Sequence, residues 1–121
     1  MTLEDLESIE GELQLTVPRW YREMLLNWPF KEESWGEVQL SKTKETIIND
    51  SKTCEVEDFP KALFIGHDGG EGLFFLDASD PEAPVYVWDM EDWTSQVAFS
   101  TSQEFLTFMS APFGEMPDAL K

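Results

Sequence analysis

His67 and Asp68 stand side by side in front of a glycine-rich segment, and this pair has the clearest potential for chemistry. Adjacent His and Asp side chains serve as ligands in metal-dependent phosphohydrolases, but those sites combine several histidines. The chain contains one histidine and one cysteine, which excludes both a multi-histidine metal site and a thiolate cage within it. The hydroxyl side chains likewise have only His67 as a candidate base, which argues against a Ser-His-Asp triad. We expect His67 to be structural or to contact a partner.

The segment Asp68-Gly69-Gly70-Glu71-Gly72 has the composition of a phosphate-binding or metal-binding loop. A phosphate cradle needs a helix start or a lysine after the glycines, whereas here an apolar strand pattern follows. An EF-hand needs oxygen ligands at alternate positions and a distal glutamate, which this segment lacks. Glycines that supply positive φ angles in a tight hairpin account for the composition. We therefore predict a hairpin turn here, with no metal and no cofactor.

Carboxylates continue along the second half of the chain and could include a general acid and a general base. Such pairs work when burial drives their pKa values apart, whereas side chains in turns stay solvated and ionised. The candidates are Asp77, Asp80, Asp89, Glu91 and Asp92, and most have the sequence context of turns. Cys54 lies in a polar segment without a neighbouring histidine, so we do not expect a thiol nucleophile. The sequence predicts a solvated acidic rim and no catalytic residue, which leaves a small hydrolase as the least favoured hypothesis.

The negative charge is unevenly distributed along the chain. There are 25 acidic and 8 basic residues, for a net charge of −17. Between Lys61 and Lys121 the chain has eleven carboxylates and no lysine or arginine. Such a field repels nucleic acid and anionic lipid, and it attracts cationic proteins. We expect a cationic protein partner, and neither a nucleic acid nor a membrane.

The composition is that of one folded domain. With 121 residues, 41% hydrophobic and 13% aromatic, the chain is too apolar for a disordered acidic tail. No apolar run approaches the roughly 20 residues that span a bilayer, and the first residues lack the basic and apolar regions of a secretion signal. A single cysteine forms no intrachain disulfide. Together these features indicate a cytoplasmic protein.

The first half of the chain has helical periodicity. Thr2 with Asp5 predicts the start of a first helix, and we expect Gly11 to weaken or end it. Pro18 suits the opening position of a second helix, which Pro29 stops. A loop over residues 30–37 and a short strand from Val38 to Leu40 precede a third helix, expected at 41–52.

The second half changes to short apolar runs separated by turns, which is typical of a strand meander. The predicted strands are Ala62–Gly66, Gly72–Asp77, Val85–Asp89 and Gln96–Phe99. Leu73–Leu76 is apolar at every position, so protein should cover both faces of that strand. Thr101 and Glu104 predict a capping box that opens a last helix. The pattern indicates an α+β fold, a single compact domain over residues 1–111 with a mainly antiparallel sheet, followed by a tail at 112–121.

Four segments, in order, resemble the SMI1/KNR4 superfamily, also called SUKH. Thr16–Leu26 is similar to its leucine–proline–x–x–tyrosine helix, and Phe64–Asp77 to its glycine-rich hairpin. Val85–Asp89 resembles the strand that follows, and Ser102–Leu106 the closing serine–x–glutamate–phenylalanine–leucine helix. The family often has an Asn-Gly turn after the second helix, where this chain has Trp28-Pro29-Phe30, which leaves the subfamily and the partner open.

The resemblance implies a compact α+β domain without general enzymatic activity. Many bacterial members resemble immunity proteins that bind and neutralise a cognate toxin, often a nuclease, and others are scaffold or regulatory modules. We expect a toxin-binding role, with the scaffold or regulatory role as the alternative. Trp93 is flanked by acids in an expected turn, a composition typical of an interface anchor. The predicted partner-binding residues are Asp68, Glu71, Trp88, Asp89, Glu91, Asp92 and Trp93. A monomer and a homodimer both stay possible, because an exposed strand edge could pair two copies.

Overall fold

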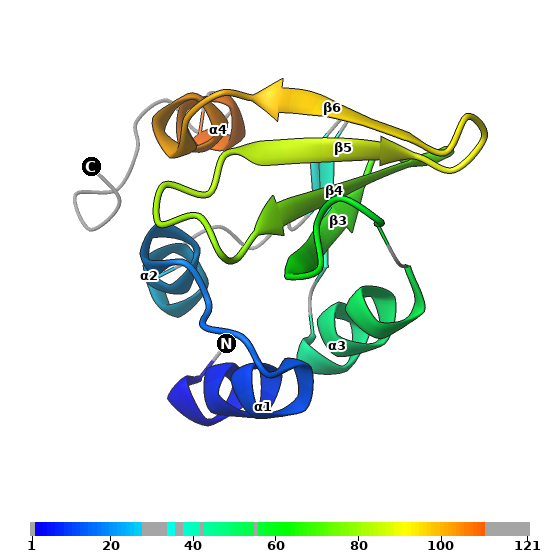
Figure 1. The fold of residues 1–121 in the computed structure, drawn as a ribbon. Coiled ribbons are helices and arrows are strands. Elements are labelled where there is room, and N and C mark those ends of the chain that lie inside the picture. Colours follow the sequence, from blue (N-terminus) through cyan, green and yellow to red (C-terminus); the bar gives the residue numbers. More distant parts are fainter. Residues whose placement is uncertain (1, 28–33, 36–37, 42, 55, 111–121) are drawn as a thin grey trace.

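The structure is a computed structural model that describes residues 2–27, 34–35, 38–41, 43–54 and 56–110. These residues form helices α1 (Leu3–Leu13), α2 (Arg19–Asn27), α3 (Lys44–Thr53) and α4 (Ser102–Ser110). The strands are β1 (Ser34–Trp35), β2 (Val38–Leu40), β3 (Ala62–His67), β4 (Gly72–Asp77), β5 (Val85–Asp89) and β6 (Thr94–Phe99). The predicted α+β fold, with helices first, a sheet next and a closing helix, is confirmed (Figure 1).

The six strands form one sheet in sequence order, and each neighbouring pair is antiparallel. In such a meander, alternate turns lie at the same end of the sheet. The β3–β4 turn and the β5–β6 turn therefore share one end, which we call the turn end. The β4–β5 connection lies at the opposite end, where α4 follows β6 (Figure 1).

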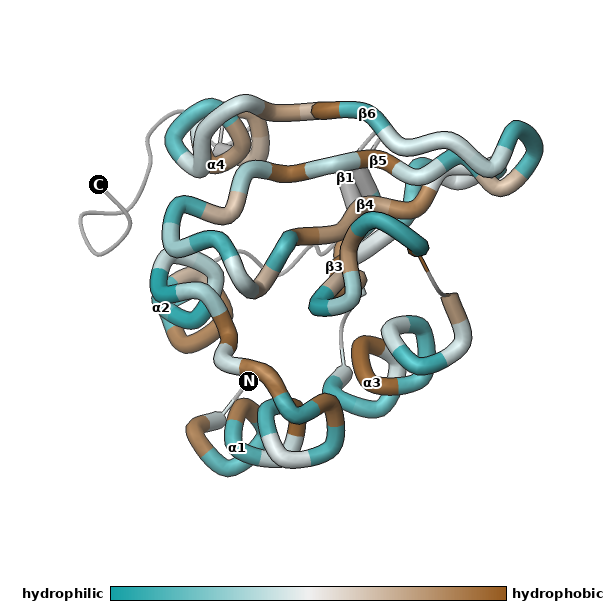
Figure 2. Tube along the Cα trace, in the orientation of Figure 1, coloured by the Kyte–Doolittle hydropathy of each residue, from teal (hydrophilic) through white to brown (hydrophobic). Residues whose placement is uncertain are grey.

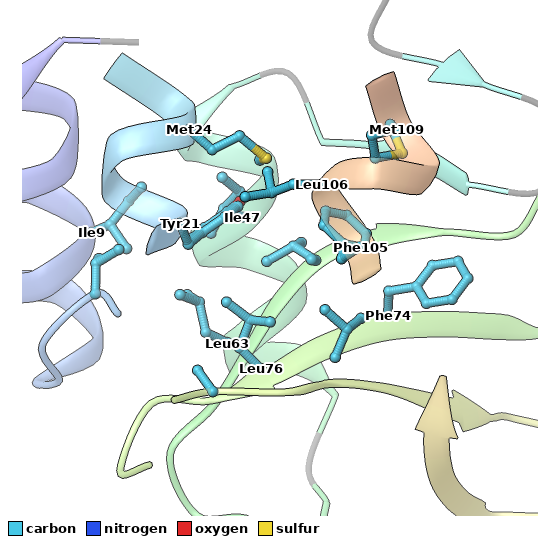
Figure 3. Close-up of a cluster of buried hydrophobic side chains, with 14 of the residues drawn as sticks. Ile9, Tyr21, Met24, Ile47, Leu63, Phe74, Leu76, Phe105, Leu106 and Met109 are labelled. Carbon is cyan, nitrogen blue, oxygen red and sulfur yellow. The ribbon is translucent and has the colours of Figure 1, made fainter. Parts of the chain in front are cut away.

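The main core lies between the helices and one face of the sheet. All four helices contribute buried side chains to it, and Figure 3 shows Ile9, Tyr21, Ile47 and Phe105 converging on the strands. Tyr21 and Ile47 are 1% and 0% exposed. Hydropathy along the trace follows this arrangement, with apolar segments on the strands and on the inward turns of the helices (Figure 2). Burial of these apolar surfaces supplies the main stabilisation of the fold.

The opposite face of the sheet has a second, smaller core. It contains Ala62, Phe64, Phe75 and Trp88, with Phe59 from the α3–β3 connector packed against it. Side chains alternate along a strand, so Phe74 and Leu76 of β4 enter the main core while Phe75 enters the smaller one. The prediction that Leu73–Leu76 is covered on both faces is confirmed.

The start of α1 is confirmed, but Gly11 does not end the helix. The Asp5 N–H donates to Thr2 Oγ1 over 3.2 Å, and the Thr2 N–H donates to Asp5 Oδ2 over 3.0 Å. The helix then continues through Gly11 to Leu13 and ends at Gln14, which has a left-handed backbone. Leu13 packs against the main core, and this tertiary packing outweighs the cost of about 1 kcal/mol for a helical glycine.

Other boundaries shift by a few residues. Residues 34–35 form β1 inside the expected loop, α3 begins at Lys44 after the N-cap Thr43, and β6 begins at Thr94. Half of the predicted capping box at α4 forms: the Glu104 N–H donates to Thr101 Oγ1, whereas the Glu104 carboxylate accepts from the Ser100 N–H. The Trp28-Pro29-Phe30 segment and the predicted tail at 112–121 lie outside the described residues.

Candidate partner-binding site

The β3–β4 turn is held together by the carboxylate of Asp68. Its Oδ1 accepts the N–H of Gly70 over 2.8 Å and the N–H of Gly72 over 3.0 Å. Gly69 has a φ of 86°, a conformation that glycine adopts without strain. The predicted hairpin is thus confirmed, and the carboxylate of Asp68 accepts hydrogen bonds from the backbone of its own turn.

Asp89 has the same role in the β5–β6 turn. Its Oδ1 accepts the N–H of Glu91 over 2.8 Å, and its carbonyl accepts the N–H of Trp93 over 2.8 Å. A carboxylate that accepts backbone N–H groups two residues along forms an Asx turn, which fixes the path of the following residues. Asp89 therefore positions Glu91 and Trp93.

The backbone joins these two turns directly. The N–H of Met90 donates to the carbonyl of Glu71 over 2.9 Å, and Gly72 is paired with Asp89 in the sheet. Glu71, Glu91 and Asp92 all have exposed side chains. The structure thus brings together at the turn end carboxylates that the sequence separates by some twenty residues.

Three of the five described Lys and Arg side chains form ion pairs away from the turn end. Ion pairs within the described residues join α1 to α2 and α3: Arg22 to Glu10 at 2.7 Å, Lys52 to Glu12 at 2.9 Å and Lys44 to Asp5 at 3.7 Å. None of these pairs lies at the turn end. Among the described residues, no ion pair involves the carboxylates of the turn end, so their negative field can act on an external partner.

The predicted tryptophans differ sharply in burial. Trp88 is 6% exposed and belongs to the smaller core, whereas Trp93 is 75% exposed. Their rings meet edge to face with centroids 5.6 Å apart. The buried Trp88 supports the ring of Trp93. Of these two candidate anchors, only Trp93 is exposed enough to contact a partner.

The backbone of Trp93 is also unusual. Its φ is 58°, in the left-handed region, which costs a residue with a Cβ roughly 1–2 kcal/mol. A bulky side chain in this conformation is held there by its surroundings and is a reason to look for a function. The conformation turns a large, exposed aromatic ring to the edge of the acidic turn.

A groove of about 470 Å³ lies beside Trp93. Its lining residues are Val56, Glu57, Asp58, Trp88, Trp93, Thr94 and Ser95. Two of these residues, Glu57 and Asp58 of the α3–β3 connector, were not among the site residues predicted from the sequence. No local pattern could have linked them to Trp93, because the connector is held there by tertiary packing, including that of Phe59 on Phe75 and Tyr86, with ring centroids 5.2 Å and 4.7 Å apart.

A larger hollow, of about 700 Å³, lies where α2, the β4–β5 connection and the start of α4 meet. It is lined by both charges, with Arg19 facing the same space as Glu23 and Glu82. Arg19 opposes the entry of a cation, so this hollow fits the expected cationic partner less well than the groove at the turn end.

The carboxylates considered for acid–base chemistry lie in two groups at opposite ends of the strands, so the set as a whole does not converge. Asp77 and Asp80 lie at the β4–β5 end, and they accept backbone N–H groups of Ser79 and Glu82 over 3.0 Å each. Asp89, Glu91 and Asp92 lie at the other end of the strands. Groups this far apart cannot act on one reacting atom.

His67 and Cys54 also have structural surroundings. His67 is exposed, and its Nδ1 accepts the N–H of Gly69 over 3.1 Å. Burial, helped by the negative charge of Asp50, raises the pKa of the Cys54 thiol and so disfavours the reactive thiolate. Within residues 2–110 as described, no group of three or more His, Cys, Asp or Glu side chains could hold a metal ion. No described helix is both long and apolar enough to cross a membrane.

Comparison with known proteins gives one finding. The model of the SMI1 / KNR4 family (SUKH-1) matches residues 1–107. No curated protein and no solved structure matches. The match covers both turns of the turn end, the α3–β3 connector and all but the last residues of α4.

Proposed function

Because the chain belongs to the SMI1/KNR4 family (SUKH-1), we propose that it is a non-enzymatic, cytoplasmic domain that binds a cationic protein, specifically an immunity protein that neutralises a cognate toxin. One observation carries this proposal. The two turns that meet at the turn end expose the side chains of Glu71, Glu91 and Asp92 together with the ring of Trp93, and none of the described ion pairs involves these carboxylates.

The mechanism has a long-range part and a short-range part. The negative field steers the cationic surface of the toxin towards the turn end and raises the association rate. Trp93 then provides apolar contact in the middle of a charged rim, the arrangement found at interface hot spots. If the toxin is a nuclease, the carboxylates would take the positions of substrate phosphates in its cleft and block it.

A charge-neutral variant tests the site. We expect Glu71→Gln/Glu91→Gln/Asp92→Asn to weaken the complex with the toxin encoded by the neighbouring gene by about 1–3 kcal/mol, mainly through slower association, because rim charges act chiefly on the encounter rate. The measurement is surface-based kinetics with the purified toxin domain. The control Glu4→Gln/Glu7→Gln/Glu45→Gln changes the net charge equally, using exposed positions on α1 and α3, and should bind nearly like the parent. Equal losses in both variants would show that only net charge matters and would remove the turn end from the site.

The identity of the partner distinguishes a scaffold or regulatory role from the immunity role. An immunity gene should lie beside a toxin gene, and its product should protect cells that express that toxin. A pull-down from the source cell that recovers only a cellular protein, together with failure to protect, would replace the immunity proposal with the regulatory one.

A further inference from the structure

We propose that the groove beside Trp93 receives an arginine side chain of the partner, with the guanidinium between the indole of Trp93 and the carboxylates of Glu57 and Asp58. Because this contact would belong to the surface proposed above, it depends on the proposed function, and it adds the chemical group that the surface recognises. The groove is formed by three separate parts of the chain: the α3–β3 connector, β5 and the start of β6.

The walls of the groove differ in chemistry. Trp88 is nearly buried and closes the floor, whereas the exposed Trp93 forms an aromatic wall. Trp88 is paired with Ser95 in the sheet, so both side chains lie on the same face. Val56, Thr94 and Ser95 add uncharged surface. This part of the groove suits the methylene stem of a long side chain, which packs on apolar surface while its charged head stays at the rim.

The connector wall is anionic. Glu57 and Asp58 are both exposed and line the groove, and neither takes part in an ion pair among the described residues. Glu91 and Asp92 lie in the turn next to Trp93. A positive group in the groove would therefore be attracted by the lining carboxylates of Glu57 and Asp58, and at longer range by the acidic turn that contains Glu91 and Asp92.

Among positive groups, guanidinium fits this combination best. It is planar, so it stacks on an aromatic face, and its edge donates several N–H groups in a fork that matches carboxylates. The lysine ammonium is a strongly hydrated point charge that lacks such a plane. Tryptophan is also the aromatic side chain with the strongest cation–π attraction.

The left-handed backbone of Trp93 supports the same assignment independently of charge. Turns that need this conformation ordinarily place Gly or Asn there, and the Trp93 side chain gains little burial in return, since it is 75% exposed. An exposed ring held in a costly conformation at the mouth of a groove is accounted for if the ring has a ligand.

The direct test uses a side-chain probe and the whole chain. Nα-acetyl-arginine methylamide is titrated into the ¹⁵N-labelled protein, and the indole N–H resonances of Trp88 and Trp93 are followed by NMR. We expect a saturable shift of the Trp93 resonance at roughly millimolar probe, as for a single charged contact. The neutral isostere Nα-acetyl-citrulline methylamide should give no saturable shift, and the lysine analogue should bind about threefold or more weakly. Equal shifts with citrulline, or no saturation with arginine, would overturn the assignment.

Two variants test whether the arginine probe binds in the groove. Glu57→Gln/Asp58→Asn should weaken arginine binding about tenfold, since two charge-assisted contacts are lost. The control Glu4→Gln/Glu7→Gln removes the same charge from the exposed side of α1 and should leave the titration unchanged. Retained binding in the groove variant would place the arginine elsewhere and refute the proposal.

The arginine titration and the toxin-binding experiment can give different results, and each combination is informative. A toxin complex that depends on Glu71, Glu91 and Asp92, combined with no arginine binding, would sustain the proposed function and reject the arginine groove. Saturable arginine binding without a toxin partner would support the groove and reject the immunity role.

Discussion

At the residue scale, neighbouring acids have different roles. Asp68 and Asp89 use their carboxylates to accept backbone N–H groups within their own turns. Glu71 lies between the two glycines whose N–H groups donate to Asp68, Glu91 donates its own N–H to Asp89, and both glutamate side chains are exposed. A carboxylate therefore fixes the backbone of a turn at one position, and at a nearby position a carboxylate adds negative charge to the surface.

A substitution of Trp93 tests whether this residue serves binding or stability. We expect Trp93→Gly to change the free energy of unfolding by no more than about 1 kcal/mol, because relief of left-handed strain offsets loss of the edge-to-face contact with Trp88. Toxin binding should weaken by about 2 kcal/mol or more, as for a hot-spot aromatic. Urea titration and calorimetry measure the two quantities.

The matched control uses another non-glycine residue with a left-handed backbone. Gln14 has a φ of 52° at the end of α1, far in sequence from the turn end. Gln14→Gly should leave stability equal or higher by up to about 1 kcal/mol and leave binding unchanged. A Trp93→Gly variant that loses several kcal/mol of stability would identify Trp93 as a structural residue instead.

At the element scale, the hairpins determine where the site lies. The β3–β4 and β5–β6 turns are adjacent because β4 and β5 pair with Gly72 opposite Asp89. The α3–β3 connector completes the site by crossing the second face of the sheet, where Phe59 and Val56 pack on the smaller core. The site thus combines two rigid turns with one packed connector.

Asp89 allows a test of whether turn geometry controls binding. Asp89→Asn keeps an oxygen that accepts the Glu91 N–H, so we expect affinity close to that of the parent, whereas Asp89→Ala should reduce both stability and affinity by about 1 kcal/mol. The comparison variant is Asp77→Ala, which removes a similar turn contact to Ser79 at the opposite end of the sheet. It should reduce stability alone. If Asp89→Asn bound as poorly as Asp89→Ala, the charge of Asp89 would be a direct contact.

At the scale of the whole molecule, the described charges are segregated. The described ion pairs link α1 with α2 and α3, whereas the turn end has carboxylates without such partners. None of those ion pairs offsets the negative charge of the turn end, so among the described residues the local field there stays negative. Such a field orients a cationic partner before contact.

This arrangement predicts a salt-dependent association rate. Between about 0.05 M and 0.5 M NaCl the association rate constant for the toxin should fall about tenfold or more, because the Debye length shortens from above 10 Å to a few ångströms. The dissociation rate should change much less, since the short-range contact of Trp93 is apolar. Stopped-flow fluorescence of Trp93 would measure both, with Trp93→Gly as the spectroscopic control. An association rate that ignores salt would contradict electrostatic steering.

Much of the fold was predictable because its signals are local. Thr2 with Asp5 marks the start of α1, Gly69 marks a hairpin, and the fully apolar Leu73–Leu76 indicates a strand covered on both sides; the structure confirms all three. Gly11 was expected to weaken or end α1, and it does not end it, because the contact of Leu13 with the core is not a property of the neighbouring residues.

The sequence by itself determined the acidic charge, the strand meander and the exposed aromatic turn, since each depends on composition or on residues a few positions apart. Only the tertiary structure decided that Trp88 is buried, and that Glu57 and Asp58 share a groove with Trp88 and Trp93. The reason is that packing of Phe59 across the sheet joins segments distant in the chain. Such contacts leave no pattern in the local sequence.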